Sequence, residues 1–488
     1  MDEILSFESG IGNVFGDLLS EKTKPCEFKI GFLACGYFEY WRMFSPRFKE
    51  NVENLLNKIA LKLKENNTVI FPKIVDTLDK ADEVGRIFRD EKVDLIIVCE
   101  GTYVPDYISM QAIDYNRDVP ILLFDVQAYN DITPQDDYEV MMENSSLIGT
   151  TQLSGSFKKM GKENYDVIVG SLEEGVCFEE IDEYVTLLKI VKDLRNLNVG
   201  VVGHVFRGMY DLENDKTKIK GTLGPNIIYV ELSHLLRLWK EVKDSDAEEE
   251  ARKFAARFNV RGVKSDDIVK SVKLGLAMKD LIDKYRLDSL CFLGQHFIEK
   301  ETGAPARIGA SMIMDKPDNI VASEGDLAGL CMMQMMYKLT GNVPLQAEWG
   351  QYDLSHNAIF LVGHGVAGTK NAKSEKDISL TTAPEEWGFE GTGCNMEFIF
   401  KPGPVTMGHL LNTSEGWQML VSSGKSLDYP TLPCNEIHAL VEVKRPVKEF
   451  VAKLHKVGVT HHVIVCHGDC KSQLIKLAEI MNIKVTEI

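Results

Sequence analysis

Residues 93–127 read VDLIIVCEGTYVPDYISMQAIDYNRDVPILLFDVQ and hold two uninterrupted apolar runs, LIIVC and ILLF, separated by a longer mixed segment. Strands that are buried on both faces read as continuous apolar runs, and the connection between two parallel strands is usually a helix. The stretch therefore predicts two strands of a parallel sheet joined by a helical crossover.

The same pattern extends outward on both sides of this stretch. Further apolar runs are FKIGFLACG at 28–36, TVIFP at 68–72 and YDVIVGS at 165–171, and the amphipathic segment ENVENLLNKIALKLKEN occupies 50–66. Short strands spaced by amphipathic helices are typical of Rossmann-like and flavodoxin-like domains, whose loops after the strands line a ligand cleft. We expect an N-terminal α/β domain over residues 1–195.

The pattern restarts and then changes. NVGVVGHV, IIYVE and SLCFLG alternate with helical stretches such as SDDIVKSVKLGLAMKDLIDKY, which predicts a second α/β domain over 196–343. Beyond it, NAIFLVGHG, MEFIFKPG, WQMLVSSG and HALVEV are short runs bounded by Gly, Pro and Asn. Such turn-bounded strands predict a β-rich, antiparallel and barrel-like C-terminal domain over 344–488.

Composition excludes several classes of protein. The 488-residue chain has a formal net charge of −18, which disfavours binding to nucleic-acid phosphates and favours a neutral, cationic or metal-bridged small ligand. The N-terminal residues show no secretory leader, no apolar stretch is long enough for a membrane span, and the ten cysteines are scattered singly. We expect a cytoplasmic protein with reduced thiols.

Two glutamates stand at positions suited to catalysis. Glu324 in ASEGD lies where a strand or loop meets an apolar helix, although a helix cap or first-turn acid is the more common role of such a residue. Glu348 in QAEWG precedes a strand and is flanked by Trp349 and Tyr352, which can stack on a polyol; a surface-loop acid is the alternative.

Histidines recur at strand ends. His364 ends the strand AIFLVGHG between two glycines, and GVTHHVIVCHGD carries His461 and His462. Strand alternation predicts that His461 and His462 point to opposite faces, so that only one of them enters a given site. Two carboxylates and two imidazoles can hold one divalent cation and leave places for substrate oxygens.

Other motifs carry little weight. Cys466, His467 and Cys470 in CHGDC could suggest zinc, but a second cysteine pair at the spacing of a zinc finger is missing. Neither GxxxxGK[ST] nor a GxGxxG after the first strand occurs, and GxSxG is absent as well. Nucleotide binding and nucleophilic acyl transfer therefore have no positive support.

These segments together resemble the L-arabinose isomerases, within the arabinose/fucose isomerase superfamily. The closing segment from PTLPCNEIHALVEV to the C-terminus, with its His-His dipeptide, is similar to that of the family, and ASEGD resembles the family's AEGD motif. Glu324, Glu348, His364 and His462 follow one another at intervals of 24, 16 and 98 residues, close to the spacing of the family's four metal ligands. The resemblance implies that these four residues bind the metal, with Mn²⁺ as the expected ion.

Weaker correspondences extend along the chain. FDVQAYND, HVFRGMYDLENDKTK and FLGQHF resemble substrate-contacting segments and imply that Gln127, Met209 and Phe297 contact the sugar. Two segments depart from the family's pattern, ACGYFEYWRMF in the first loop and AEWGQYDLS around Glu348. Both departures concern the sugar pocket rather than the metal.

The resemblance implies an aldose–ketose isomerase acting on an aldopentose or aldohexose such as L-arabinose through a cis-enediol. Glu324 and Glu348 would be the acid/base pair, and the family's trimers or hexamers imply a homo-oligomer. Alternatives are a fucose-isomerase-like enzyme on another sugar, a non-catalytic sugar-binding protein, and a metal-dependent hydrolase or lyase.

Overall fold

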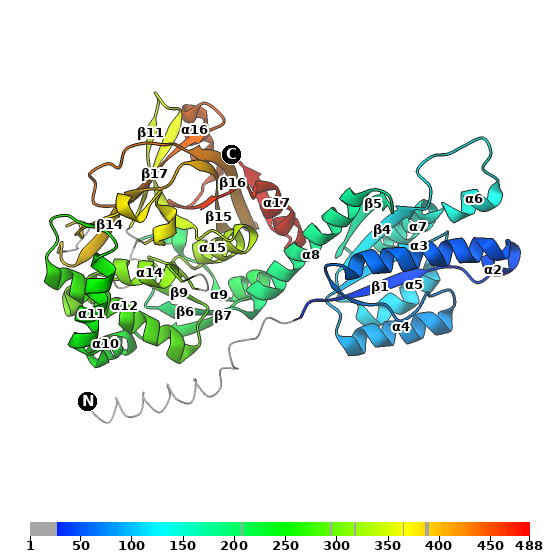
Figure 1. The fold of residues 1–488 in the computed structure, drawn as a ribbon, viewed down its shortest axis with the longest axis horizontal. Helices are drawn as coiled ribbons and strands as arrows, with labels where there is room; N and C mark the ends of the chain where they lie inside the picture. The colour runs from blue at the N-terminus through cyan, green and yellow to red at the C-terminus, as the bar shows by residue number, and fades with distance from the viewer. Residues whose placement is uncertain (1–26, 206–207, 293–294, 317–318, 365, 386–389) are drawn as a thin grey trace. The chain divides into compact units, whose positions relative to one another are not determined.

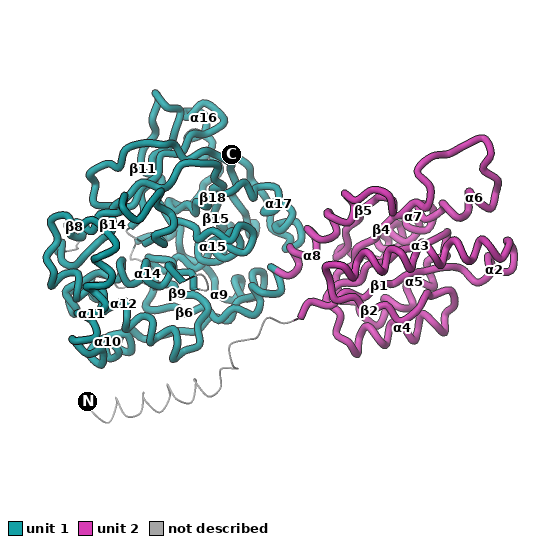
Figure 2. The backbone as a smooth tube through the Cα atoms, viewed as in Figure 1, with its two compact units in different colours: residues 1–24, 190–488 teal, residues 25–189 magenta. Residues whose placement is uncertain are grey.

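The computed structural model describes residues 27–205, 208–292, 295–316, 319–364, 366–385 and 390–488. Residues 1–26, on which the expectation about a leader falls, lie outside the described residues. The chain divides into two compact units, residues 25–189 and residues 190–488 together with 1–24 (Figure 2). None of the described helices combines the length and apolar character needed to cross a lipid bilayer.

The unit of residues 25–189 is built on a five-stranded parallel sheet in the order β2-β1-β3-β4-β5. This is the strand order of flavodoxin-like domains, so the predicted parallel α/β fold is confirmed here. In Figure 1, α3 and α4 lie on opposite sides of β1. The strands are β1 (Lys29–Cys35), β2 (Thr68–Ile70), β3 (Leu95–Glu100), β4 (Ile121–Gln127) and β5 (Tyr165–Ser171). The helices are α2 (Tyr40–Met43), α3 (Pro46–Lys64), α4 (Leu78–Glu91), α5 (Asp106–Ile113), α6 (Tyr138–Glu143) and α7 (Ser146–Met160), while α8 (Gly175–Asn196) runs on into the other unit.

The larger unit contains a second parallel sheet, in the order β10-β9-β6-β7. Its strands are β6 (Asn198–Val202), β7 (Asn226–Val230), β9 (Ser289–Phe292) and β10 (Ile320–Ala322). Its helices are α9 (Lys216–Lys218), α10 (Leu232–Glu241), α11 (Asp244–Ala255), α12 (Ser265–Tyr285), α13 (Gln295–Thr302), α14 (Arg307–Met314) and α15 (Leu327–Thr340). Residues 327–336 of α15 are all buried, which fits a helix that is apolar on every side.

The β-rich part of this unit closes on itself. Six strands pair antiparallel in the ring β16-β15-β18-β11-β12-β17, and β16 pairs with β17 to complete it. The predicted antiparallel, barrel-like architecture is therefore confirmed. The strands are β11 (Leu345–Asp353), β12 (Ala358–Gly363), β15 (Gly403–Thr413), β16 (Gly416–Ser426), β17 (Ile437–Val443) and β18 (His462–His467). Around the ring lie β8 (Asn259–Val260), β13 (Ser379–Thr382), β14 (Cys394–Ile399), β19 (Lys484–Glu487), α16 (Val447–Val457) and α17 (Lys471–Ile480).

The barrel shares its core with the helices before it. Phe254 of α11, Val272 of α12 and Ile308 of α14 belong to the same buried cluster as Leu361, Met407 and Val465 of the barrel strands. β8, which precedes α12 in the chain, pairs with β13. The division of the chain at 195/196 and 343/344 stays a prediction, and the parallel sheet of β6, β7, β9 and β10 lies in the same compact unit as the barrel.

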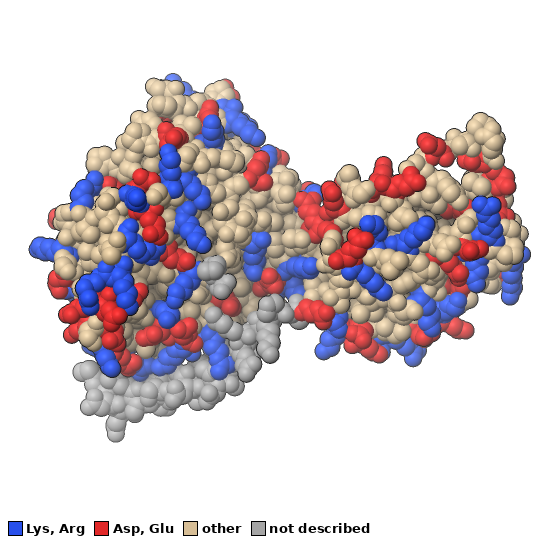
Figure 3. Space-filling model, in the orientation of Figure 1, with Lys and Arg blue, Asp and Glu red and all other residues tan. Residues whose placement is uncertain are grey.

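Charge is mixed over the surface. On the face seen in Figure 3, basic and acidic side chains lie side by side over both units. The net charge of −18 therefore does not come from one segregated acidic region on this face.

One buried acid in the smaller unit makes stability depend on pH. Glu100 ends β3 and is 2% exposed; its Oε1 accepts a hydrogen bond from Ser109 Oγ at 2.9 Å, whereas its buried Oε2 has no partner. Burial raises the pKa of Glu100 from 4.5 to about 8 against the opposing effect of the Ser109 hydrogen bond. In the folded protein this carboxyl therefore keeps its proton at neutral pH.

We predict that Glu100 lowers the free energy of unfolding as pH rises from about 4.5 to about 8, because the unfolded chain releases this proton and the folded chain retains it. The loss amounts to at most about 5 kcal/mol, and Glu100→Gln removes it. The measurement is denaturant unfolding of the full chain between pH 5 and pH 9. The exposed Glu91→Gln serves as the control, and equal pH slopes for Glu100→Gln and the unchanged protein would contradict the prediction.

Candidate metal centre

Two of the four predicted ligands lie on neighbouring strands of the barrel, and a third, His364, directly follows the strand on the other side of β11. β11 runs between β18 and β12, and Glu348 pairs with His462 on one side and with Val362 on the other. His364 follows Val362 by two residues and therefore shares the face of Glu348. Gly365, one of the two glycines flanking His364, lies outside the described residues. The register thus brings together side chains that are far apart in the sequence.

The fourth predicted ligand, Glu324, lies in the turn from β10 into α15. Its φ is 61°, a left-handed conformation that is costly for a residue with a side chain, and Gly325 follows with a φ of 73°. A Cβ at Gly325 would lie 2.7 Å from the Cα of Val205, so only glycine fits there. The helix cap considered for Glu324 belongs instead to Asp326, whose Oδ1 accepts a hydrogen bond from Gly329 N at 2.7 Å.

The four side chains meet. His462 Nε2 lies 2.9 Å from Glu324 Oε2, and His364 Nε2 lies 2.8 Å from Glu348 Oε1 and 3.6 Å from Glu324 Oε1. A six-coordinate cation with bonds of about 2.1 Å places neighbouring donors about 3 Å apart and opposite donors about 4.2 Å apart. The measured separations fall within this range or at its lower edge.

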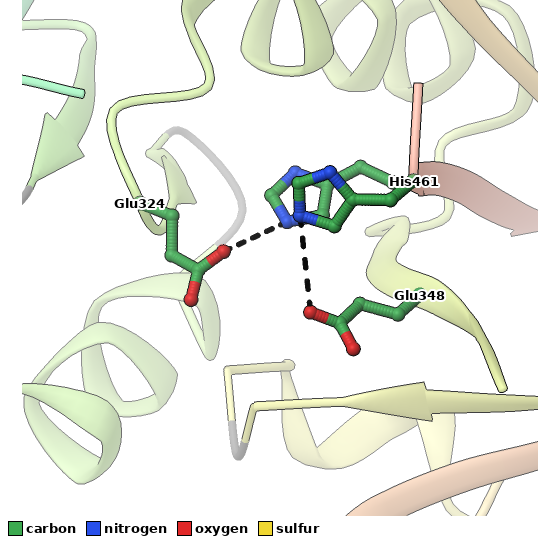
Figure 4. Close-up of side chains that lie close together, drawn as sticks. Glu324, Glu348 and His461 are labelled. Carbon is green, nitrogen blue, oxygen red and sulfur yellow. Dashed lines mark hydrogen bonds and ion pairs between the residues drawn. The ribbon is translucent and has the colours of Figure 1, made fainter. Parts of the chain in front are cut away.

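His461 also faces this cluster, so the expectation that His461 and His462 point to opposite faces is wrong. β18 begins at His462, and the backbone N of His461 donates to Asp211 Oδ2 at 2.9 Å instead of joining the strand ladder. The two imidazole rings lie 4.4 Å apart, and His461 Nε2 is 4.0 Å from Glu348 Oε1. Figure 4 shows the His461 ring and the carboxylates of Glu324 and Glu348 pointing toward one another.

A buried carboxylate, Asp326, holds His462 from behind. Asp326 Oδ2 accepts hydrogen bonds from His462 Nδ1 at 2.9 Å and from His409 Nε2 at 2.8 Å, and all three side chains are at most 2% exposed. A carboxylate on the second ring nitrogen is the usual support of a metal-binding histidine, because it fixes the ring and its tautomer. Asp326 stands two residues after Glu324 in ASEGD and could have been noticed there, whereas His409 gave no signal in the sequence.

Gln346 ties β11 to the turn that carries Glu324. Its Oε1 accepts from Ser323 N at 2.8 Å, and its Nε2 donates to Ser323 O at 3.3 Å and lies 2.9 Å from His462 Nδ1. Gln346 and Glu348 are two residues apart on one strand and so share a face. This link fixes Glu324 relative to the barrel.

The cluster is strongly coupled electrostatically. Burial raises the pKa of Glu324 and of Glu348, but the hydrogen bonds from His462 and His364 and the charges of these imidazoles outweigh it and leave both pKa values below the usual range. Burial lowers the pKa of His462, yet the hydrogen bonds to Asp326 and Glu324 outweigh it and raise that pKa to about 10. The pKa of His364 is raised in the same way, mainly by Glu348. Both glutamates are therefore carboxylates at neutral pH.

The described residues fit a divalent cation. One ligand atom from each of Glu324, Glu348, His461 and His462 lies within 4.8 Å of the others, and the buried Nε2 of His461 has no hydrogen-bond partner. Mixed carboxylate and imidazole donors suit first-row transition metals. Asp326, His409 and His462 form a second such group, but hydrogen bonds among its own members already satisfy it.

The three residues predicted to contact the sugar lie on different elements of the fold. Met209 precedes the short helix η2 (Tyr210–Leu212) and lies two residues before Asp211, whose carboxylate binds His461. Phe297 is 47% exposed on α13. Gln127 ends β4 in the other compact unit, where it lines a pocket of about 490 Å³.

Trp349 and Tyr352, singled out as possible sugar-stacking residues, line a pocket whose lining includes neither Glu324 nor Glu348. This pocket, of about 500 Å³, is also bounded by His461 and Asp211. Trp349 packs against Phe450 and donates from Nε1 to Thr460 O at 3.2 Å. Adjacent strand residues point to opposite faces, so Trp349 is turned away from the face of Glu348.

The CHGDC motif does not gather into a metal site within the part of the chain that the structure describes. His467 stacks on Phe400 with ring centroids 4.2 Å apart, and Cys466 Sγ lies 3.2 Å from Thr340 Oγ1. Burial raises the pKa of both Cys466 and Cys470, so these thiols stay protonated. Asp211, in contrast, is a residue at the candidate site that no sequence signal indicated.

Comparison with known proteins gives an independent view of this site. Residues 362–488, which include His364, His461 and His462, match the family described as L-fucose isomerase, C-terminal domain.

Similarity to whole proteins extends over most of the chain. The sulfoquinovose isomerase of Alkalicoccus urumqiensis is 22% identical over 419 residues, which cover 85% of this chain and 91% of that protein. That of Priestia aryabhattai is 21% identical over 86% of this chain and 92% of that protein, and the L-arabinose isomerase of Thermotoga petrophila is 22% identical over 92% and 94%. These matches confirm the resemblance to the arabinose/fucose isomerase superfamily.

Proposed function

We propose that this protein is a metal-dependent aldose–ketose isomerase that interconverts an aldose and its ketose through a cis-enediol. The observation that carries this proposal is that three contacts of 2.8 to 3.6 Å between donor atoms link Glu324, Glu348, His364 and His462. The relatives named above are isomerases of sugars, which supports the same reaction class.

We propose that Glu324, Glu348, His364 and His462 hold the cation, with Mn²⁺ as the expected ion. When bound, such a cation polarises a sugar carbonyl and stabilises negative charge that develops on its oxygen. Asp326 and Gln346 keep His462 and the turn of Glu324 in place.

The two glutamates would divide the proton transfers. Isomerisation moves one proton between C1 and C2 and another between their oxygens. It therefore needs a group that accepts a proton as a base and then donates it as an acid. The Glu348 side chain is 28% exposed and that of Glu324 is 9% exposed, so Glu348 is the better placed to reach a substrate proton. His364 Nε2 lies 2.8 Å from Glu348 Oε1, a separation that suits two neighbouring donors to one cation.

Two substrate classes follow from the relatives. Sulfoquinovose isomerases are among these relatives, so a sulfonated and therefore anionic aldose is one candidate. A neutral aldose such as L-arabinose is the other candidate. The two differ by a fixed negative charge, so a protein adapted to one binds the other poorly.

We further propose that the enzyme acts in the cytoplasm as a homo-oligomer, a trimer or a hexamer, on a free sugar rather than on a nucleic acid or a membrane. The net charge of −18 supports the exclusion of nucleic acid. The fucose-isomerase-like alternative concerns the sugar and is decided by the same substrate screen.

Glu324→Gln and Glu348→Gln are each expected to lower turnover by at least about 100-fold, because each removes a proton acceptor and a charged donor while keeping the side-chain shape. Turnover is measured as ketose formed, and folding is checked by circular dichroism and thermal unfolding. Glu442→Gln, an exposed glutamate on β17, is the matched control and keeps normal turnover. Near-normal isomerisation in either site variant would refute the assignment.

Metal and substrate are tested together in a screen. We expect the Mn²⁺-loaded protein to form a ketose from one of a set that contains sulfoquinovose, L-arabinose, L-fucose and other aldopentoses and aldohexoses. The chelator-stripped protein should lose this activity and regain it on addition of Mn²⁺. Sugar binding by calorimetry without any ketose would instead support a binding protein.

A further inference from the structure

His461 has an orientation that its neighbours in the sequence do not explain. Its Nδ1 lies 2.6 Å from Asp211 Oδ2, and its backbone N donates to the same oxygen at 2.9 Å. The side chain is 34% exposed, yet Nε2 itself is shielded from solvent and has no hydrogen-bond partner. A buried ring nitrogen with nothing to bind is unfavourable, so its presence calls for an explanation.

The environment of Nε2 is a set of metal-binding groups. His461 Nε2 lies 4.0 Å from Glu348 Oε1, and the ring is 4.4 Å from that of His462. Ligand atoms of Glu324, Glu348, His461 and His462 all lie within 4.8 Å of one another. His461 Nε2 therefore faces the space that the other donors share.

The pairing of His461 with Asp211 repeats the arrangement behind His462. In both histidines Nδ1 lies against a carboxylate, that of the buried Asp326 for His462 and that of the exposed Asp211 for His461. The carboxylate favours a proton on Nδ1 and aims Nε2 at the cluster. Asp211 follows β6 in the chain and reaches His461 from a separate segment, so strand geometry alone does not produce the contact.

We propose that His461 is a further ligand of the divalent cation and that Asp211 is its positioning residue. The inference rests on the proposed function, because it presupposes that the cluster binds a cation. It adds a donor to the four that the spacing of the motifs predicts. It also gives the segment after β6 a direct influence on the cation through Asp211.

The test measures Mn²⁺ binding to the chelator-stripped full chain. Free Mn²⁺ is counted by continuous-wave electron paramagnetic resonance, and imidazole nitrogens bound to Mn²⁺ are detected by pulsed measurements of the ¹⁴N coupling. We expect His461→Gln to weaken Mn²⁺ binding at least tenfold and to remove one imidazole coupling. Asp211→Asn, which keeps an oxygen that can accept from Nδ1, is expected to weaken binding by about tenfold and to reduce the same coupling.

His356→Gln is the matched control. His356 Nδ1 lies 2.8 Å from Asp353 Oδ2, so this substitution removes a similar Asp–His pair at the surface of the same unit. It should change neither the Mn²⁺ affinity nor the ¹⁴N couplings. Mn²⁺ affinity within twofold of the unchanged protein and an unchanged set of couplings in His461→Gln would overturn the proposal. If the unchanged protein binds no Mn²⁺, the metal dependence in the proposed function fails and the inference falls with it. Loss of binding in His364→Gln but not in His461→Gln would retain the proposed function and overturn only the inference.

Discussion

The placement of the candidate site depends on one constraint, the register of β11 between β18 and β12. Pairing of Glu348 with His462 and with Val362 places a carboxylate between two strands that each deliver an imidazole to the same face. A slip by one residue would turn Glu348 to the other face, where Trp349 now packs against Phe450. Closure of the barrel through β16 and β17 leaves the strands of the ring without free edges and so holds this register.

The second requirement of the candidate site is that several buried charged groups are stabilised by their neighbours. Asp326 is fully buried and would be costly as an isolated carboxylate, but it accepts hydrogen bonds from two imidazoles and from the backbone N of Gly329. The imidazoles lower its pKa despite burial, so it remains charged and stabilises a proton on Nδ1 of His462. Nε2 of the same ring is thereby left to face Glu324.

Much of the fold could be predicted because it depends on local patterns. Continuous apolar runs such as LIIVC mark strands of parallel sheets, and the short turn-bounded runs after Val343 mark the barrel. Pairing of β8 with β13 could not be predicted, since a two-residue strand leaves no pattern and lies far from its partner in the chain. For the site, spacing selected Glu324, Glu348, His364 and His462, which the structure brings together. The orientation of His461 was predicted wrongly because alternation applies only inside a strand and β18 begins one residue later.

The proposed cation donors and the expected sugar contacts differ in how the fold holds them. Glu348 and His462 lie in strands and are fixed by ladder hydrogen bonds, whereas Met209 lies in the segment after β6 and Phe297 is exposed on α13. Side chains in loops and on exposed helices can change without disturbing the barrel. A superfamily whose relatives carry the names of different sugars is consistent with this separation, because proton transfer at C1 and C2 needs the same groups whatever the rest of the sugar bears. Asp211 is an exception to this division. It lies in the segment after β6, outside the barrel strands, and yet it contacts His461 at the cluster. A change in the segment after β6 that displaces Asp211 would therefore also alter the carboxylate and imidazole cluster.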